Sequence, residues 1–201
     1  LLDDSIVKLD GLRLKDEEID KIERIIFIAC GTSWHAGLVG EYLIEEYARI
    51  PVEVEYASEF RYRKPVLKKG DLVITISQSG ETADTLAALR EAKAKGVKVL
   101  GITNVVGSTI ARESDGGVYI HAGPEIGVAS TKAFTSQITV ILLLTVLLAR
   151  RKEMSFTEGR SILNDLIRLP ELVQSVLSGN ESIKEIAEVY YNKNNFLYLG
   201  R

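Results

Sequence analysis

The stretch "DLVITISQSGETADTLAALR" (residues 71–90) joins an apolar run to an amphipathic one through a polar turn. β-Branched residues dominate the apolar run, which is typical of a strand buried on both faces of a parallel sheet. Leu86, Leu89 and Ala92 then recur at steps of three, as on one face of a helix. The stretch therefore predicts a strand at 71–77, a turn rich in hydroxyl groups, and a helix.

The same order of strand and helix recurs on both sides of this unit. The run "RIIFIACGTS" (24–33) predicts a strand over 25–29, and "VEVEY" (52–56) predicts another after a helix that Pro51 ends. Further strands are expected at 97–103 and 117–122. A long apolar helix is expected at about 130–151, after the loop "GPEIGVAS" (123–130). Alternating strands and helices predict an α/β fold whose mostly parallel sheet is covered on both faces.

The C-terminal part of the chain has a different character. Ser155 with Glu158 fits a helix capping box, and Pro170 is expected to interrupt the helical pattern that follows. Two more helical stretches reach about Asn192. The final run "NFLYLGR" (195–201) has the character of residues 24–31, so we expect the first strand of a second α/β unit there. Because the chain also begins without methionine, both ends indicate a piece of something longer.

The composition narrows the class of protein. The chain has 201 residues, 46% of them hydrophobic and 26% charged, which is typical of one globular domain with a substantial core. A net charge of −3 argues against nucleic-acid binding, which needs a basic surface. The longest apolar run, residues 138–149, is shorter than the ~20 residues that span a bilayer, so no membrane partner is expected. Cys30 is the only cysteine, which excludes an intrachain disulfide and favours a reducing, cytoplasmic setting.

Polar loops follow several of the expected strands, at residues 30–33, 77–82, 103–104 and 122–131. In parallel sheets, ligands bind beyond the carboxyl ends of the strands, where these loops would converge. A strand-to-helix turn there exposes the first N–H groups of the helix and the positive end of its dipole, which suits an anion. Ser, Thr and Gly residues in these loops add hydroxyl donors and permit close backbone approach. The pattern predicts a site for a small phosphate ester; the alternative is that each Ser or Thr only caps its helix.

Other binding and catalytic motifs fit less well. The sequence has no G-x-G-x-x-G or G-x-x-x-x-G-K-[ST] motif, which disfavours dinucleotide and P-loop sites. Ser79 lies where a hydrolase nucleophile would, but G-x-S-x-G is absent. The soft metal ligands are His35, His121 and Cys30 without paired spacing, so we expect neither a metal nor a cofactor.

Several single residues keep two interpretations. Cys30 fits packing better than nucleophilic catalysis, and His121 fits a structural or surface position within a strand. Glu125 and Lys132 lie in or beside the converging loops, where each could contact a sugar or form a salt bridge. Glu81 suits the positive end of a helix dipole, and we expect its carboxylate to point away from the ligand.

Five segments together resemble the glucosamine-6-phosphate synthase family, which belongs to the wider sugar isomerase (SIS) domain family. They are "ACGTS" (29–33), "ASEFRYRK" (57–64), "ISQSGETADTLAALR" (76–90), "RESD" (112–115) and "EIGVASTKAFTSQ" (125–137). The resemblance implies a three-layer αβα sandwich around a five-stranded parallel sheet. It also implies a lead-in at 1–24, a first SIS domain at 25–152, a helical linker at 153–194, and the first strand of a second SIS domain at 195–201.

The resemblance implies a function as well. The family takes ammonia released by a glutaminase domain and converts fructose 6-phosphate to glucosamine 6-phosphate in two tandem SIS units, usually associating through them, which implies a homodimer. By this analogy, Ser77, Gln78, Ser79 and Thr82 would hold the sugar phosphate with help from Ser33. The residues implied to line the sugar are Cys30, Gly31, Thr32, Val128, Ala129 and Ser130.

The chain departs from the family in the groups that carry the chemistry. The cysteine nucleophile of the glutaminase domain does not occur here. The acid/base glutamate, the ring-opening histidine and the Schiff-base lysine of the family belong to later segments, so no residue is assigned a catalytic role. We therefore expect a fragment that binds a phosphosugar without turning it over. Two alternatives stay open: a non-catalytic SIS-type sensor of sugar phosphates, and a phosphosugar isomerase that needs no ammonia.

Overall fold

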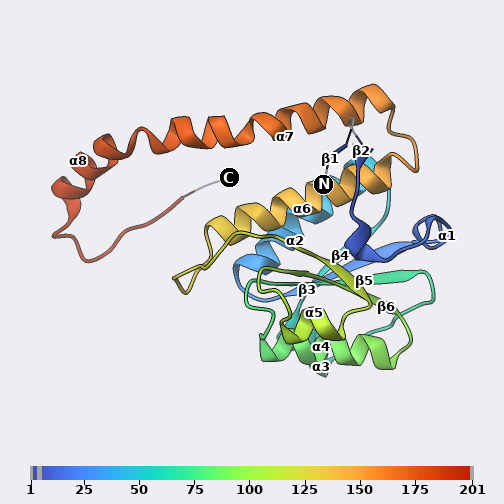
Figure 1. Ribbon diagram of the computed structural model, residues 1–201. Coiled ribbons are helices and arrows are strands. Elements are labelled where there is room, and N and C mark those ends of the chain that lie inside the picture. The colour runs from blue at the N-terminus through green and yellow to red at the C-terminus, as the bar shows by residue number, and fades with distance from the viewer. Residues whose placement is uncertain (1, 4–5, 200–201) are drawn as a thin grey trace. The chain divides into compact units, whose positions relative to one another are not determined.

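Five parallel strands form the central sheet of the computed structural model, which describes residues 2–3 and 6–199 (Figure 1). The strands are β3 (Arg24–Ala29), β4 (Val52–Tyr56), β5 (Asp71–Ser77), β6 (Lys98–Thr103) and β7 (Gly116–Tyr119). Their order in the sheet is β4-β3-β5-β6-β7. The sheet thus begins with β3, adds β4 beside it as one edge, and then adds β5, β6 and β7 in turn on the other side. The connections reverse direction between β3 and β5, and crevices for ligands form at such reversals in open α/β sheets.

Helices cover both faces of this sheet. On one face lie α2 (Thr32–Ala48) and α6 (Lys132–Ala149), which pack on each other (Figure 1). On the other face lie α3 (Ala57–Tyr62), α4 (Ala83–Ala94) and α5 (Thr109–Glu113). The expected three-layer α/β sandwich is therefore confirmed.

Successive side chains of a strand point to opposite faces of the sheet, so the core has two layers, one on each face. In β3, Ile26 and Ile28 pack with Phe60, Ala88 and Leu89 beneath the sheet. The intervening Phe27 faces α2, where it would lie 2.9 Å from a Cβ on Gly40. All of β5 is buried, as expected for a strand with helices on both faces.

Helix α6 is the one helix in the described part of the chain that is long and apolar enough to cross a membrane by length and composition. Ten of its residues are buried inside the fold. A core helix passes the same test, and the packing of α6 against α2 gives it that role here.

The N-terminal residues belong to the same compact unit as the sheet. They form β1 (Leu2–Asp3), β2 (Ile6–Val7), the 3-10 helix η1 (Asp10–Leu12) and α1 (Asp16–Ile19). Side chains such as Leu9, Leu12 and Ile22 are buried. The unit extends to Arg160, eight residues beyond the expected end of the first SIS domain, and a second unit begins at Ser161.

One expectation for the C-terminal part is wrong. Helix α7 (Phe156–Leu177) continues through Pro170, because proline removes a single backbone donor and the turns on both sides keep their own hydrogen bonds. Helix α8 (Asn180–Tyr190) follows. No strand is assigned to residues 195–199, and residues 200–201 lie outside the described residues, so the first strand of a second SIS domain stays a prediction. The capping position is as expected, with the Glu158 N–H donating to Ser155 Oγ at 3.1 Å.

Candidate functional site

A cavity of about 240 Å³ lies at the carboxyl ends of β3 and β5, the two neighbouring strands between which the strand order reverses. Three loops supply its walls: the turn after β3, the turn after β5, and the loop before α6. The lining residues are Cys30, Gly31, Thr32, Ser33, Ile76, Ser77, Gln78, Ser79, Thr82, Gly127, Val128 and Ser130. Ten of the eleven residues expected at the site therefore lie together. The exception is Ala129, which is in the same loop but exposed and outside the lining.

The turn after β5 is held by its own side chains. Ser77 Oγ accepts a hydrogen bond from the Gly80 N–H at 3.0 Å and lies 3.1 Å from Thr82 Oγ1. Ser79 Oγ accepts from the Glu81 N–H at 3.1 Å. These contacts fix three hydroxyl groups around one turn.

Gly80 is required at this turn for two reasons. Its φ of +68° lies in the left-handed region, which other residues adopt at a cost. A Cβ at this position would also lie 2.0 Å from Ser108 Oγ. The tight turn after β5 therefore depends on the absence of a side chain.

Two helices begin at the cavity. Helix α2 starts at Thr32, directly after Gly31, whose φ is +58°, and α4 starts at Ala83, directly after Thr82. The first N–H groups of each helix have no partner within their own helix, and both dipoles present their positive ends here. None of the lining residues is lysine or arginine. The site is thus a neutral cradle of hydroxyls and amides, which suits a small anionic group.

The loop before α6 is anchored by Glu125. Its Oε1 accepts from the Thr131 N–H at 3.0 Å and from Thr131 Oγ1 at 3.1 Å, and its Oε2 accepts from the Ala133 N–H at 2.8 Å. These backbone hydrogen bonds lower the pKa of Glu125. The carboxylate therefore caps α6, which answers the question that the sequence left open for this residue. Lys132 is exposed and does not line the cavity.

The loop after β6 does not line the cavity, although its place at the end of a strand led us to expect it there. Asn104 supports its neighbours instead: its N–H donates to Gln78 O at 3.3 Å, and its side chain bonds to Ala122 N–H and Gly123 O at 2.8 and 2.7 Å. Ala122 and Gly123 thus bond to the Asn104 side chain and not to the backbone of a neighbouring strand. Strand β7 ends at Tyr119 rather than at Ala122. His121 is accordingly outside the strand, exposed, with a φ of +51°.

Glu81 points away from the cavity, as expected. Its Oε1 accepts from the Thr109 N–H at 2.8 Å, and this backbone hydrogen bond is the main reason for its lowered pKa. The carboxylate lies at the start of α5, so it links two loops and is not a cavity wall.

Sequence reasoning missed Gln137, which is fully buried in α6 and donates from Nε2 to Ser33 Oγ at 3.0 Å. It is a polar residue just before the apolar run 138–149, and that was the available signal. Its partner, 104 residues away, could only be identified from the fold.

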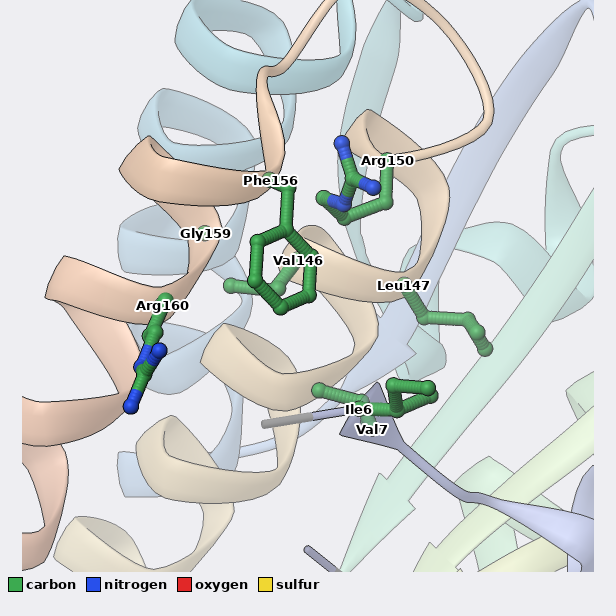
Figure 2. A pocket seen from close by; sticks show the side chains of 8 residues that line it. All are labelled: Ile6, Val7, Val146, Leu147, Arg150, Phe156, Gly159 and Arg160. Atoms are coloured by element: carbon green, nitrogen blue, oxygen red, sulfur yellow. The ribbon is translucent and has the colours of Figure 1, made fainter. Parts of the chain in front are cut away.

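Two other cavities differ from this one in chemistry. The first, of about 200 Å³, is mainly apolar and lies between β2, the end of α6 and the start of α7. Figure 2 shows the Phe156 ring among Val146, Ile6 and Val7, with the Arg150 guanidinium 5.6 Å from the ring centre. The second, of about 690 Å³, lies beside the edge strand β7 and includes Arg13 and Arg112. Neither contains any of the expected site residues.

No group of three or more His, Cys, Asp or Glu side chains that could hold a metal occurs in the described ranges, 2–3 and 6–199. Cys30 is a free, partly buried thiol at the cavity wall. The chemistry that the walls offer is hydrogen bonding to an anion and to hydroxyl groups.

Comparison with known proteins agrees with this geometry. A glutamine–fructose-6-phosphate aminotransferase (isomerising) of Chlorobaculum tepidum is 57% identical over 97% of the chain, and that of Caldanaerobacter subterraneus is 50% identical over 100%. The chain spans only 32% and 33% of their lengths. The solved C-terminal domain of the glucosamine-fructose-6-phosphate aminotransferase of Francisella tularensis is 41% identical and superposes with a TM-score of 0.88, covering 96% of this chain and 54% of that one.

The sequence profile of the SIS domain matches residues 18–147, which include the whole sheet and every wall of the cavity. The chain belongs to the SIS domain family.

Proposed function

We propose that the cavity binds the phosphate group of a phosphosugar, either fructose 6-phosphate or glucosamine 6-phosphate. The observation that carries the proposal is the turn after β5, in which Ser77, Ser79 and Thr82 present hydroxyls beside the first amides of α4. Gln78 adds a side-chain donor from the same turn, and Ser33 adds one from the first turn of α2, a second helix start at the cavity. A phosphate ester in such a cradle needs no lysine, because hydroxyls and amides satisfy its oxygens.

The remaining walls suit the sugar. The turn after β3 contributes Cys30, Gly31 and Thr32 to the cavity, and the loop before α6 contributes Val128 and Ser130. Ala129 would contribute through the backbone of its loop if that loop closes on the sugar. The cavity of about 240 Å³ is slightly smaller than the ~300–1,000 Å³ of typical small-ligand pockets, so part of a bound hexose phosphate would stay exposed to solvent.

We further propose that the chain is the first SIS unit of a glutamine–fructose-6-phosphate aminotransferase (isomerising). The identity with two such enzymes supports this over nearly the whole chain. A glutaminase domain and a second SIS unit would be its partners within the parent protein, which we expect to be cytoplasmic and homodimeric.

The cavity alone offers binding rather than turnover. Shifting a proton between C1 and C2 of the sugar needs a positioned acid/base group. None of the lining residues is His, Asp, Glu or Lys, the side chains that commonly supply such a group. We therefore expect this chain to bind fructose 6-phosphate and to show no isomerase activity by itself.

Calorimetry tests the proposal. The wild-type chain should bind fructose 6-phosphate and not fructose, and the double variant Ser77→Ala/Ser79→Ala should lose binding. The matched control is Thr135→Ala/Thr157→Ala, which removes two exposed hydroxyls outside the cavity. Unchanged affinity in the Ser77/Ser79 variant would rule out the cradle, and robust synthase turnover by the wild-type chain would rule out its non-catalytic role.

A further inference from the structure

Gln137 connects the core of the protein to the wall of the cavity. Its side chain is fully buried, and Nε2 donates a hydrogen bond to Ser33 Oγ at 3.0 Å. Ser33 lines the cavity and is 6% exposed. The contact therefore lies directly behind the surface that a ligand would touch.

Close helix packing holds the two residues together. About two turns further along α2 and one turn further along α6, the helices approach so closely that a Cβ on Gly40 would lie 2.8 Å from Ile141 Cγ2. Ile141 follows Gln137 by four residues, so both side chains lie on the same face of α6. The position of the Gln137 amide is thus set by the helix pair.

The direction of this hydrogen bond decides what Ser33 can do. A hydroxyl has one proton to donate. Because Gln137 Nε2 donates to it, Ser33 keeps its own proton for an acceptor in the cavity. In the reversed amide, Oε1 would accept that proton and neither N–H of Gln137 would have a partner. In the observed orientation one N–H donates to Ser33 Oγ, and Oε1 is without a partner among the described residues.

We propose that Gln137 is a positioning residue that fixes Ser33 as a hydrogen-bond donor toward the phosphate of the sugar. The inference rests on the proposed function, because it needs an anionic acceptor in the cavity. Gln137 itself does not line the cavity and would act only through Ser33.

A double-mutant cycle separates this role from a structural one. The affinity of the 201-residue chain for fructose 6-phosphate is measured by calorimetry for wild type, Gln137→Met, Ser33→Ala and the double variant. We expect Gln137→Met to weaken binding about tenfold, as for a lost hydrogen bond to a charged group, and to have no further effect in the Ser33→Ala background. Thr145→Val, which changes another buried polar residue of α6, is the matched control and should bind as wild type does.

The isosteric variant Gln137→Glu supplies a second readout, and it carries the test if Gln137→Met does not fold by circular dichroism. An ionised carboxylate would accept the Ser33 proton and place a negative charge behind the phosphate. Wild-type affinity should rise with pH as the phosphate loses its second proton near ~6. Affinity of Gln137→Glu should instead fall as pH rises and its carboxyl group ionises.

The outcomes are distinct. Equal weakening by Gln137→Met in both backgrounds, or a wild-type pH profile in Gln137→Glu, would assign Gln137 a purely structural role and overturn the inference. Wild-type affinity in Gln137→Met would overturn it while leaving the proposed function intact. Absence of binding by the wild-type chain would overturn both.

Discussion

The Glu125 carboxylate accepts a hydrogen bond from the Ala133 N–H at 2.8 Å and thereby ties the loop before α6 to the first turn of that helix. The loop carries Gly127, Val128 and Ser130 to the cavity. Its geometry therefore depends on one acidic residue that does not itself line the cavity.

Replacing Glu125 by Ala should loosen this loop. The N–H groups of Thr131 and Ala133 lose their acceptor, so hydrogen exchange at both should accelerate and the thermal midpoint should fall. Glu153→Ala, which changes an exposed acidic residue outside this loop, is the control. Unchanged exchange at Ala133 would contradict the capping role.

The same residue predicts a pH dependence. Backbone hydrogen bonds lower the pKa of Glu125 below its ordinary value of 4.5, so the stabilisation is fully present above that pH and is lost as pH falls through the lower, folded-state value. The difference in free energy of unfolding between wild type and Glu125→Gln should thus be largest above pH 4.5 and shrink in acid. A difference that stays constant with pH in urea titrations would argue against this origin.

Asp71 should matter for stability and not for binding. Its nearly buried carboxylate accepts from Arg24 Nε at 3.0 Å and from the Lys68 N–H at 2.6 Å, at the end of β5 opposite the cavity. Burial raises the pKa of Asp71, but the hydrogen bonds from Arg24 and Lys68 outweigh it and the net pKa is lowered. Asp71→Asn should cost about 3 kcal/mol of unfolding free energy in denaturant titrations, with fructose 6-phosphate affinity retained by the folded fraction.

Gly80→Ala should disrupt the turn after β5. Left-handed backbone strain and the clash with Ser108 Oγ together should cost about 2–4 kcal/mol, and ligand affinity should fall. Adding Ser108→Gly removes the clash and not the strain, so the double variant should recover part of the stability. No recovery in thermal unfolding would show that the clash does not determine the cost.

Much of the fold could be predicted from local patterns. β-Branched runs located all five sheet strands, and β5 and β4 have the expected bounds. The predicted interruption at Pro170 was wrong. Proline disfavours a helix only locally, whereas α7 is stabilised over 22 residues. The run 195–199 has strand character but needs a pairing partner, which a local pattern cannot supply.

The part of the site that is formed by residues at the ends of strands could be predicted from the sequence. Ser77, Ser79 and Cys30 follow buried strands, so parallel topology places them together. The prediction that the loop after β6 lines the site was wrong. The cavity lies between β3 and β5, where the strand order reverses, and Asn104 hydrogen-bonds to the neighbouring loop. The Gln137–Ser33 contact depends on how α2 and α6 pack, and no local pattern contains that information.

A crystal structure of the chain with fructose 6-phosphate tests the central claim most directly. The account predicts phosphate density within hydrogen-bond distance of the hydroxyls of Ser77, Ser79 and Thr82, at the start of α4. Density for the phosphate in the cavity beside β7, near Arg13 and Arg112, with the turn after β5 empty, would contradict it.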